Sequence, residues 1–88
     1  GLVNKVVPKE QLLDAAREWA ASIAWSAPLA MQSVKEVQRE IECVPLEKAF
    51  HKMRTDPMPT YRKMLKSEDA KEGVAAFVEK RNPNFKGG

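Results

Sequence analysis

The chain has 88 residues, of which 43% are hydrophobic and 31% are charged, and its formal net charge is +3. These values are typical of one small globular domain, and no apolar run is long enough for a transmembrane helix. The mild charge favours local anion sites over a general nucleic-acid-binding surface. Because a chain of this size buries only about two-thirds of its unfolded surface, we expect a marginal core that needs a partner.

The chain opens with an extended segment, followed by the first predicted helix. Residues 2–7 are rich in valine and end at Pro8, which predicts a β-strand whose pairing partners lie outside this chain. Residues 9–25 are predicted to be helical because apolar side chains recur there at helical spacing. The apolar stripe of this helix consists of Leu12, Leu13, Ala16, Trp19, Ala20 and Ile23.

The second predicted helix is bounded by prolines. Ser26 and Pro28 are start signals, and the Val-Pro pair at residues 44–45 closes the helix after Cys43. The side chains predicted to face inward are Ala30, Val34, Val37 and Ile41.

Two shorter helices are predicted next, separated by the breaker TDPMP at residues 55–59. The apolar face of the third helix consists of Leu46, Ala49, Phe50 and Met53, and that of the fourth consists of Tyr61, Met64 and Leu65.

The fifth predicted helix has the clearest boundaries. Ser67 can accept a hydrogen bond from a free backbone N–H, and Glu68 and Asp69 place negative charge at the positive end of the helix dipole. Asn82 precedes Pro83, which disfavours the helical conformation and should stop the helix. The stripe predicted to be buried consists of Ala70, Val74, Phe77, Val78 and Arg81.

Gly73 lies inside this fifth helix, where glycine costs about 1 kcal/mol relative to alanine. Its presence indicates that another element approaches the backbone closely. Together the segments predict an all-α fold: about five helices after a short N-terminal extended segment, without an internal repeat or a second domain.

Six short motifs are spread along the chain: GLVNKVVP at residues 1–8, SAPLA at 26–30, VPLEKAF at 44–50, SEDAKEG at 67–73, AFVEKR at 76–81 and NFK at 84–86. Together they resemble the C-terminal end of the enoyl-CoA hydratase/isomerase (crotonase) superfamily. Residues 44–50 and 67–86 look most like the carnitinyl-CoA dehydratase or general enoyl-CoA hydratase branches. The resemblance implies that residues 1–8 are a strand-like link to an absent catalytic core. It also implies that residues 9–88 are the C-terminal helical oligomerisation domain.

The resemblance also implies an activity for a parent protein, most of all a lyase reaction. Such an enzyme adds or removes water at an acyl-CoA thioester, or isomerises it. In that superfamily the two catalytic carboxylates and the oxyanion hole belong to an upstream core, and this sequence begins at Gly1 without one. We therefore expect one part of a longer protein that is inactive alone, and we assign no catalytic residue.

Phe77 and Lys80 are the candidate residues for binding coenzyme A (CoA). They are three residues apart, so a helix would place an aromatic plane beside a cation. A phenyl ring can pack on the adenine of CoA, and an ammonium group can pair with its phosphate. Enzymes of the resembled superfamily often use a lysine and a phenylalanine at this end of the last helix, sometimes from a neighbouring subunit. From the residues alone, a core Phe77 and a solvated Lys80 are the alternative.

Cys43 and His51 are interpreted as structural residues. One cysteine excludes an internal disulfide and fits a reducing compartment, and we interpret Cys43 as a small buried hydrophobic side chain. His51 has no histidine, cysteine or acid at metal-ligand spacing, so we predict no metal site. We expect a cytoplasmic protein, with the mitochondrial matrix as the alternative.

Two further groups of side chains have residue types that can carry chemistry. The first could line an acyl-chain pocket or simply pack in the core; its members are Met53, Met58, Met64 and Tyr61. The second consists of carboxylates at helix ends and polar faces, where we expect solvation and assign no general acid or base; its members are Glu36, Glu40, Glu42 and Glu47.

The large apolar residues exceed what five short helices can hide, which predicts an interface. The resemblance implies a homo-oligomer, a trimer or hexamer, whose helices close over the CoA site. Trp25 is the candidate contact residue, with a buried hinge position as the alternative.

A stand-alone helical interaction module without CoA affinity is the second hypothesis. A weak nucleic-acid binder is the third, through Arg62, Lys63, Lys66 and residues 80–86, and interleaved acids argue against it.

Overall fold

The computed structural model describes residues 1–88 and is all-helical, with five α-helices and no strand. The elements are a 3-10 turn η1 (Lys9–Gln11) and the helices α1 (Leu12–Ala24), α2 (Pro28–Ile41), α3 (Leu46–Thr55), α4 (Pro59–Leu65) and α5 (Glu68–Glu79). The predicted fold class is therefore confirmed. No helix has the length and apolar character needed to cross a membrane.

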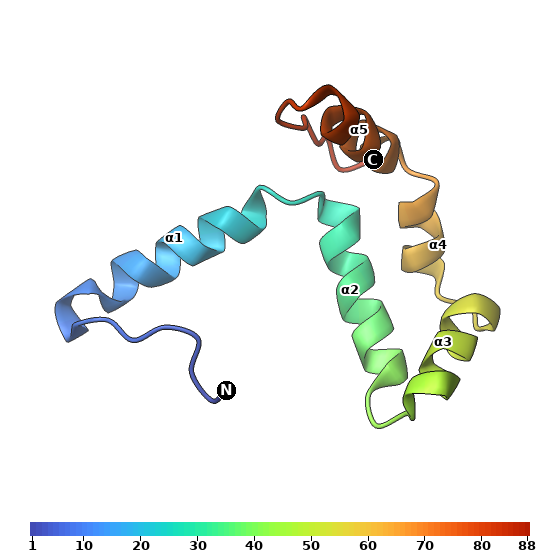
Figure 1. Ribbon diagram of the computed structural model, residues 1–88, viewed down its shortest axis with the longest axis horizontal. Helices are drawn as coiled ribbons and strands as arrows, with labels where there is room; N and C mark the ends of the chain where they lie inside the picture. Colours follow the sequence, from blue (N-terminus) through green and yellow to red (C-terminus); the bar gives the residue numbers. More distant parts are fainter.

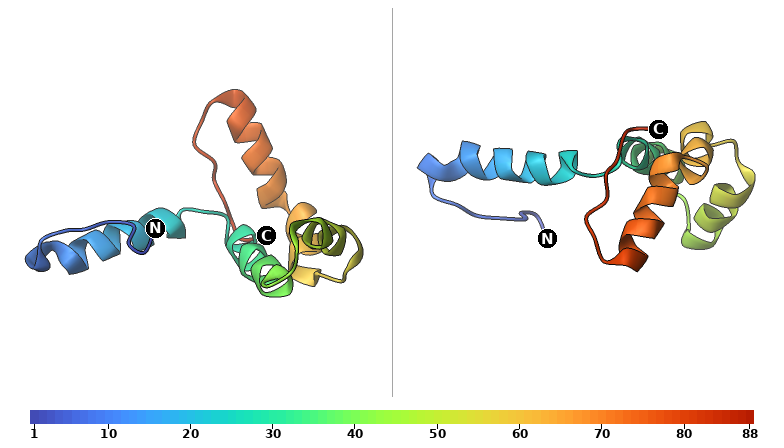
Figure 2. Two further views of the ribbon diagram at one scale, coloured as in Figure 1. Left: turned by 60° about the horizontal axis from the view of Figure 1, so that its bottom comes forward. Right: turned by 90° about the horizontal axis from the view of Figure 1, so that it is seen from above.

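The helices form one group and one projecting arm. Helices α2 and α4 make the most extensive contact, α3 connects the end of α2 to the start of α4, and α5 follows α4 (Figure 1). Helix α1 projects away from this group in every view, with the N-terminal segment beside it (Figures 1 and 2). The C-terminal tail, residues 81–88, runs back from the end of α5 toward the start of α2 (Figure 2).

The chain is much more open than a compact domain of its size. Its radius of gyration is 16.4 Å, whereas a compact chain of this length has about 12 Å. Its accessible surface is 7539 Å², whereas a compact monomer of this mass exposes about 5,200 Å². The excess is roughly 2,300 Å², well above the roughly 800 Å² per partner that a standard protein interface removes.

The buried core is correspondingly small. Seven of the 88 residues are buried, and only Met58 has a large side chain that is completely enclosed. The buried apolar residues are Leu29, Ala49, Met58 and Ala76, and the buried polar residues are Ser33, Ser67 and Asp69. Hydrophobic burial within the chain therefore contributes little to holding the helices together.

Polar contacts between helices compensate in part. The Glu36 carboxylate of α2 accepts hydrogen bonds from the backbone N–H groups of Thr60 (3.2 Å) and Tyr61 (2.7 Å), so it caps the start of α4. Desolvation alone would raise the pKa of Glu36, but these two N–H groups outweigh it and lower the pKa below its ordinary value. Our expectation that Glu36 is merely solvated is wrong, because its partner helix lies 24 residues further along the chain.

Arg62 caps the C-terminal end of α3, whereas Glu36 caps the start of α4. Its guanidinium donates to the backbone carbonyls of Met53 (2.9 Å) and Arg54 (2.7 Å), which have no partner within their own helix. Together, Glu36 and Arg62 fix α2, α3 and α4 relative to one another.

Helix boundaries follow the predicted signals with two corrections. Pro28 occupies the first turn of α2 as predicted, but the N-cap is Ala27 and Ser26 makes no capping bond. The Ser67 hydroxyl caps α5 as predicted, by accepting from the backbone N–H of Ala70 at 3.1 Å. Helix α5 ends at Glu79, before the predicted stop at Asn82, because the next residue turns into the left-handed conformation.

Several predicted buried stripes are exposed. Helix α1 has no buried residue, although its apolar stripe has the predicted spacing. On α5, Val74, Phe77 and Val78 are 67%, 86% and 72% exposed, and on α2, Val34 is 57% exposed. The spacing predicted the helices correctly and the burial wrongly, because no other part of this chain packs closely enough on these stripes to cover them.

Residues 2–7 have no strand partner within this chain, and their predicted pairing with segments outside it stays a prediction. Leu2, Val3 and Val7 line a groove beside α1 together with Leu12 and Trp19. One prediction about the connecting segments needs correction. Cys43 is exposed rather than buried, since it occupies the turn after α2 with a φ of 62°.

The neighbour that approaches Gly73 is the tail. A Cβ atom on Gly73 would lie 3.6 Å from Cε1 of the Phe85 ring, which is an ordinary van der Waals contact. Replacing Gly73 by alanine should therefore stabilise α5 by about 0.5–1 kcal/mol, the helix-propensity difference, without displacing the ring. Denaturant unfolding of the two proteins measures the difference. A loss of stability would show that Phe85 packs too closely to admit a methyl group.

Candidate functional site

Phe77 lies on the last full turn of α5 with its ring 86% exposed. It borders an apolar groove of about 430 Å³, whose lining includes Ala30, Met64, Val74 and Phe85. Within this chain, Phe77 is therefore not part of a core. An exposed ring at the edge of an apolar groove is available to pack against a flat apolar group.

Lys80 lies at the point where α5 ends and the chain turns. Its backbone has φ 55° and ψ 40°, the left-handed conformation. The N–H of Lys80 reaches the carbonyl of Phe77 (3.3 Å), and the N–H of Arg81 reaches the carbonyl of Ala76 (3.0 Å), which is the pattern of a Schellman motif. Glycine usually occupies this position, because left-handed backbone costs other residues about 1–2 kcal/mol.

The turn changes the predicted relation between Phe77 and Lys80. The prediction placed both on one continuous helix face, whereas Lys80 begins the segment that turns back. Both side chains are exposed at the same end of α5. Lys80 makes no ion pair, whereas Lys71 pairs with Glu68 (2.6 Å).

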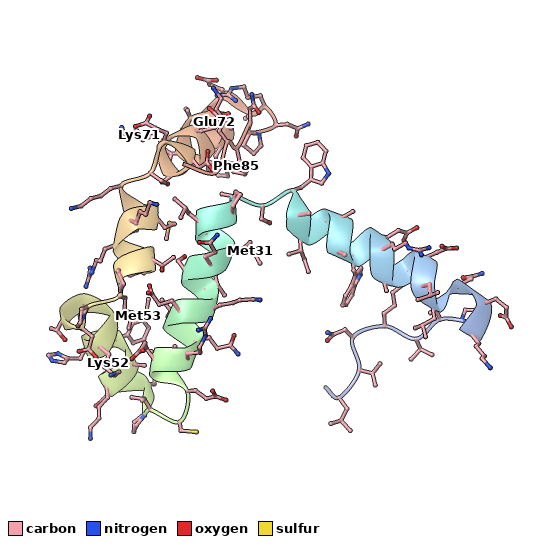
Figure 3. All side chains as sticks on the ribbon, turned by 180° about the vertical axis from the view of Figure 1, so that it is seen from behind. Met31, Lys52, Met53, Lys71, Glu72 and Phe85 are labelled. Atoms are coloured by element: carbon pink, nitrogen blue, oxygen red, sulfur yellow. The ribbon has the colours of Figure 1, made fainter.

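Glu72 connects α5 to the tail. Its carboxylate accepts both terminal nitrogens of Arg81, at 2.6 and 2.9 Å, together with the backbone N–H of Asn84 at 2.8 Å. Figure 3 labels Glu72 and Phe85 at the α5 end of the molecule. The Arg81 guanidinium, followed by the Asn84 N–H, lowers the pKa of Glu72 from its ordinary value of 4.5 to about 2. Arg81 also pairs with Glu79, and its own pKa is raised by both carboxylates, Glu72 first.

Asp69 holds the end of the tail. Its carboxylate accepts the backbone N–H groups of Lys86 and Gly87, both at 2.7 Å, and the N–H of Asp69 donates to the carbonyl of Gly88 at 2.9 Å. Asp69 is only 3% exposed, so these donors and the start of α5 must offset the cost of burying its charge. We call the bonds made by Asp69 and Glu72 to the tail the tail clasp.

The clasped tail places Phe85 between two apolar grooves. Phe85 faces Gly73 on one side and lines the groove that also contains Phe77. On its other side it borders a hollow of about 320 Å³ together with Trp25 and Pro28. Trp25 is 79% exposed, so it is not buried within this chain.

The methionine cluster divides between two roles. Met53, Met64 and Tyr61 line a third apolar groove of about 440 Å³ on α2, whereas Met58 is completely buried and packs in the core. His51 is exposed. No cluster of three or more histidine, cysteine or acidic side chains could hold a metal ion.

Sequence reasoning missed the tail clasp. Asp69 was interpreted only as a charge at the helix start, and Arg81 was placed in a buried stripe, whereas its side chain is 41% exposed and paired. Glu72 and Arg81 lie on either side of the end of α5, and the three- and four-residue spacing that predicts side-chain neighbours applies only within a helix. The signals that could have pointed to a returning tail are the Asn-Pro turn and the terminal glycines.

The chain matches a known family over its whole length. The family described as enoyl-CoA hydratase/isomerase matches residues 1–88. A carnitinyl-CoA dehydratase from Escherichia coli (strain SMS-3-5 / SECEC) is 45% identical over 87 residues, which are 99% of this chain and 33% of that protein. A carnitinyl-CoA dehydratase from Citrobacter koseri is 44% identical over the same shares. The chain thus spans about a third of the length of these relatives and corresponds to their C-terminal third.

Solved structures give the same result. An enoyl-CoA hydratase/isomerase from Mycobacterium paratuberculosis superimposes with a TM-score of 0.84 at 35% identity, covering 100% of this chain and 33% of that one. An enoyl-CoA hydratase from Mycobacterium tuberculosis H37Rv gives a TM-score of 0.79 at 33% identity, with the same coverage. The open arrangement of the helices is therefore shared with these structures.

The tail clasp should make stability depend on pH. Because the folded-state pKa of Glu72, about 2, lies below its ordinary value of 4.5, its stabilising effect is complete above about pH 4.5 and is lost as the pH falls toward 2. Glu72→Gln should flatten this part of the acid-unfolding curve. The matched control is Glu68→Gln, which removes a charge from the same helix without touching the tail. Parallel curves for wild type and Glu72→Gln would contradict the prediction.

Proposed function

The chain belongs to the enoyl-CoA hydratase/isomerase family, and on that premise we propose that it is the C-terminal helical part of an enzyme acting on acyl-CoA thioesters. The enzyme adds or removes water, as the name of the carnitinyl-CoA dehydratases implies for those relatives. In this enzyme the helices join subunits, and the end of α5 contacts the CoA nucleotide. The match over the full chain to the C-terminal third of these relatives is the observation that carries the proposal.

Phe77 and Lys80 are the proposed CoA contacts. The nucleotide of CoA offers a flat adenine and several phosphate charges. The exposed ring of Phe77 suits the adenine, and the unpaired ammonium of Lys80 suits a phosphate. Glu72 and Glu79 are both engaged by Arg81, and Lys80 has no carboxylate partner of its own.

The chain contributes binding rather than acid–base chemistry. Its most strongly engaged carboxylates are bound to backbone N–H groups: Glu36 to the start of α4, and Asp69 and Glu72 to the tail. The pKa values of Glu36 and Glu72 are lowered, so these two carboxylates are poorly suited to accept protons. We propose that the reacting carboxylates and the oxyanion hole belong to the rest of the enzyme, so this chain is inactive alone. Contacts to the remote nucleotide then supply binding energy that holds the thioester in place.

The open shape supports an assembly role. Roughly 2,300 Å² of surface exceeds that of a compact monomer, and α1 carries exposed apolar side chains. These are Leu12, Leu13, Trp19 and Ile23, with Trp25 following the helix. We propose that these faces pack against the rest of the enzyme and against neighbouring subunits of a homo-oligomer, a trimer or hexamer.

The same exposed faces fit a second candidate function, a helical interaction module without CoA affinity. Titration of the enzyme with CoA separates the two candidates, since only the first predicts saturable binding that depends on Lys80.

Removing the Lys80 ammonium should weaken acyl-CoA binding. In the intact enzyme, Lys80→Ala should raise KM for acyl-CoA about fivefold. This factor corresponds to the loss of one exposed ion pair of about 1 kcal/mol. Rising salt should shrink this difference. Lys80→Gly should raise KM equally, although glycine relieves the left-handed backbone.

The control for this experiment is Lys71→Ala, since Lys71 lies at the other end of α5 and pairs with Glu68. Its KM should equal that of wild type. An unchanged KM in Lys80→Ala at all salt concentrations would overturn the proposed CoA contact.

The isolated chain should not behave as a stable monomer. Because its apolar faces lack partners, we expect concentration-dependent self-association in sedimentation experiments and a melting temperature that rises with concentration. Trp25→Gln should reduce the association. A strict monomer with a sharp, concentration-independent melt would contradict the assembly role.

A further inference from the structure

We infer that Glu72 is a positioning residue for the CoA nucleotide, because its bonds to Arg81 and Asn84 fix the turn that carries Lys80. The inference rests on the proposed function, since it concerns the residue proposed to bind the phosphate. Glu72 lies two turns before Lys80 on α5 and would touch no ligand itself.

The geometry places Lys80 between two fixed points. On its N-terminal side, its N–H is bound to the carbonyl of Phe77 at the end of α5. On its C-terminal side, Arg81 is held by Glu72 through two bonds of 2.6 and 2.9 Å. Asn84 donates to the same carboxylate at 2.8 Å, which closes the loop from residue 81 to residue 84.

The backbone of Lys80 needs this support. A non-glycine residue at φ 55° stays in the left-handed conformation only when its surroundings require it. Without Glu72, the Arg81 N–H still reaches the Ala76 carbonyl and its side chain still reaches Glu79 and the Asn82 carbonyl. However, neither the Arg81 guanidinium nor the Asn84 N–H is then held to the middle of α5. The turn would then relax, and the backbone position from which the Lys80 side chain extends would no longer be fixed.

Electrostatics and positioning predict opposite signs for the loss of Glu72. If only charge mattered, Glu72→Gln would remove a negative charge near the phosphates and lower KM for acyl-CoA. If Glu72 positions Lys80, the same change raises KM, because the neutral amide offers one acceptor oxygen in place of two.

The experiment measures KM and kcat of the intact enzyme with two substrates. One is acyl-CoA, and the other is the acyl-pantetheine thioester, which lacks the nucleotide. We expect Glu72→Gln to raise KM for acyl-CoA about two- to fivefold, no more than Lys80→Ala does, and to leave acyl-pantetheine unchanged. In the Lys80→Ala background the added Glu72→Gln change should have no further effect. Glu68→Gln is the matched control and should behave as wild type.

A second variant keeps the test decisive if Glu72→Gln fails to assemble. Glu72→Asp retains the charge but is one methylene too short to hold both Arg81 and Asn84, so it should also raise KM for acyl-CoA.

Each other outcome has a defined meaning. A KM that is unchanged or lowered in Glu72→Gln and Glu72→Asp, with a raised KM in Lys80→Ala, overturns the positioning role and leaves the proposed function standing. Equal losses with both substrates, or an effect that persists in the Lys80→Ala background, also overturn it, since Glu72 would then act on the fold as a whole. An unchanged KM in Lys80→Ala overturns the proposed function and the positioning role together.

Discussion

The arrangement of this chain depends on carboxylates that bind backbone N–H groups of distant segments. Glu36 holds the start of α4, and Asp69 and Glu72 hold the returning tail. A chain with four buried apolar residues cannot fix its helices by hydrophobic packing alone. Charge-assisted bonds to the backbone have defined directions, so three acids can set the position of α4 and of the tail in an open structure.

The open shape of the fold is consistent with its proposed role in assembly, because both follow from apolar helix faces that this chain leaves exposed. Stripes on α1 and α5 have the spacing of buried faces, yet they remain exposed within the chain. A face that is apolar and unpartnered fits a segment whose core is completed by other parts of an enzyme or by other subunits. The bonds of Glu36, Asp69 and Glu72 to backbone N–H groups then hold the helices in place, while the apolar faces remain available for those contacts.

Local features of the fold could be predicted from the sequence, and long-range ones could not. Ser67, Pro28 and the breaker at residues 55–59 determine helix ends through their own backbone chemistry, and five helices were found as expected. Burial was mispredicted on Val74 and Val78, because spacing indicates which side chains share a face but not whether another element covers it. Phe77 and Lys80 were proposed from residue type and resemblance, whereas Glu72 was missed because its partners lie beyond the end of its helix.

The central claim is that the end of α5 meets the CoA nucleotide, and a crystal structure of the intact enzyme with bound acyl-CoA tests it most directly. We predict that the adenine packs against Phe77 within about 4 Å and that the Lys80 ammonium lies within ion-pair distance of a phosphate, in the enzyme's own site or that of a neighbouring subunit. A nucleotide bound away from α5, with Phe77 buried against another protein surface, would contradict the account.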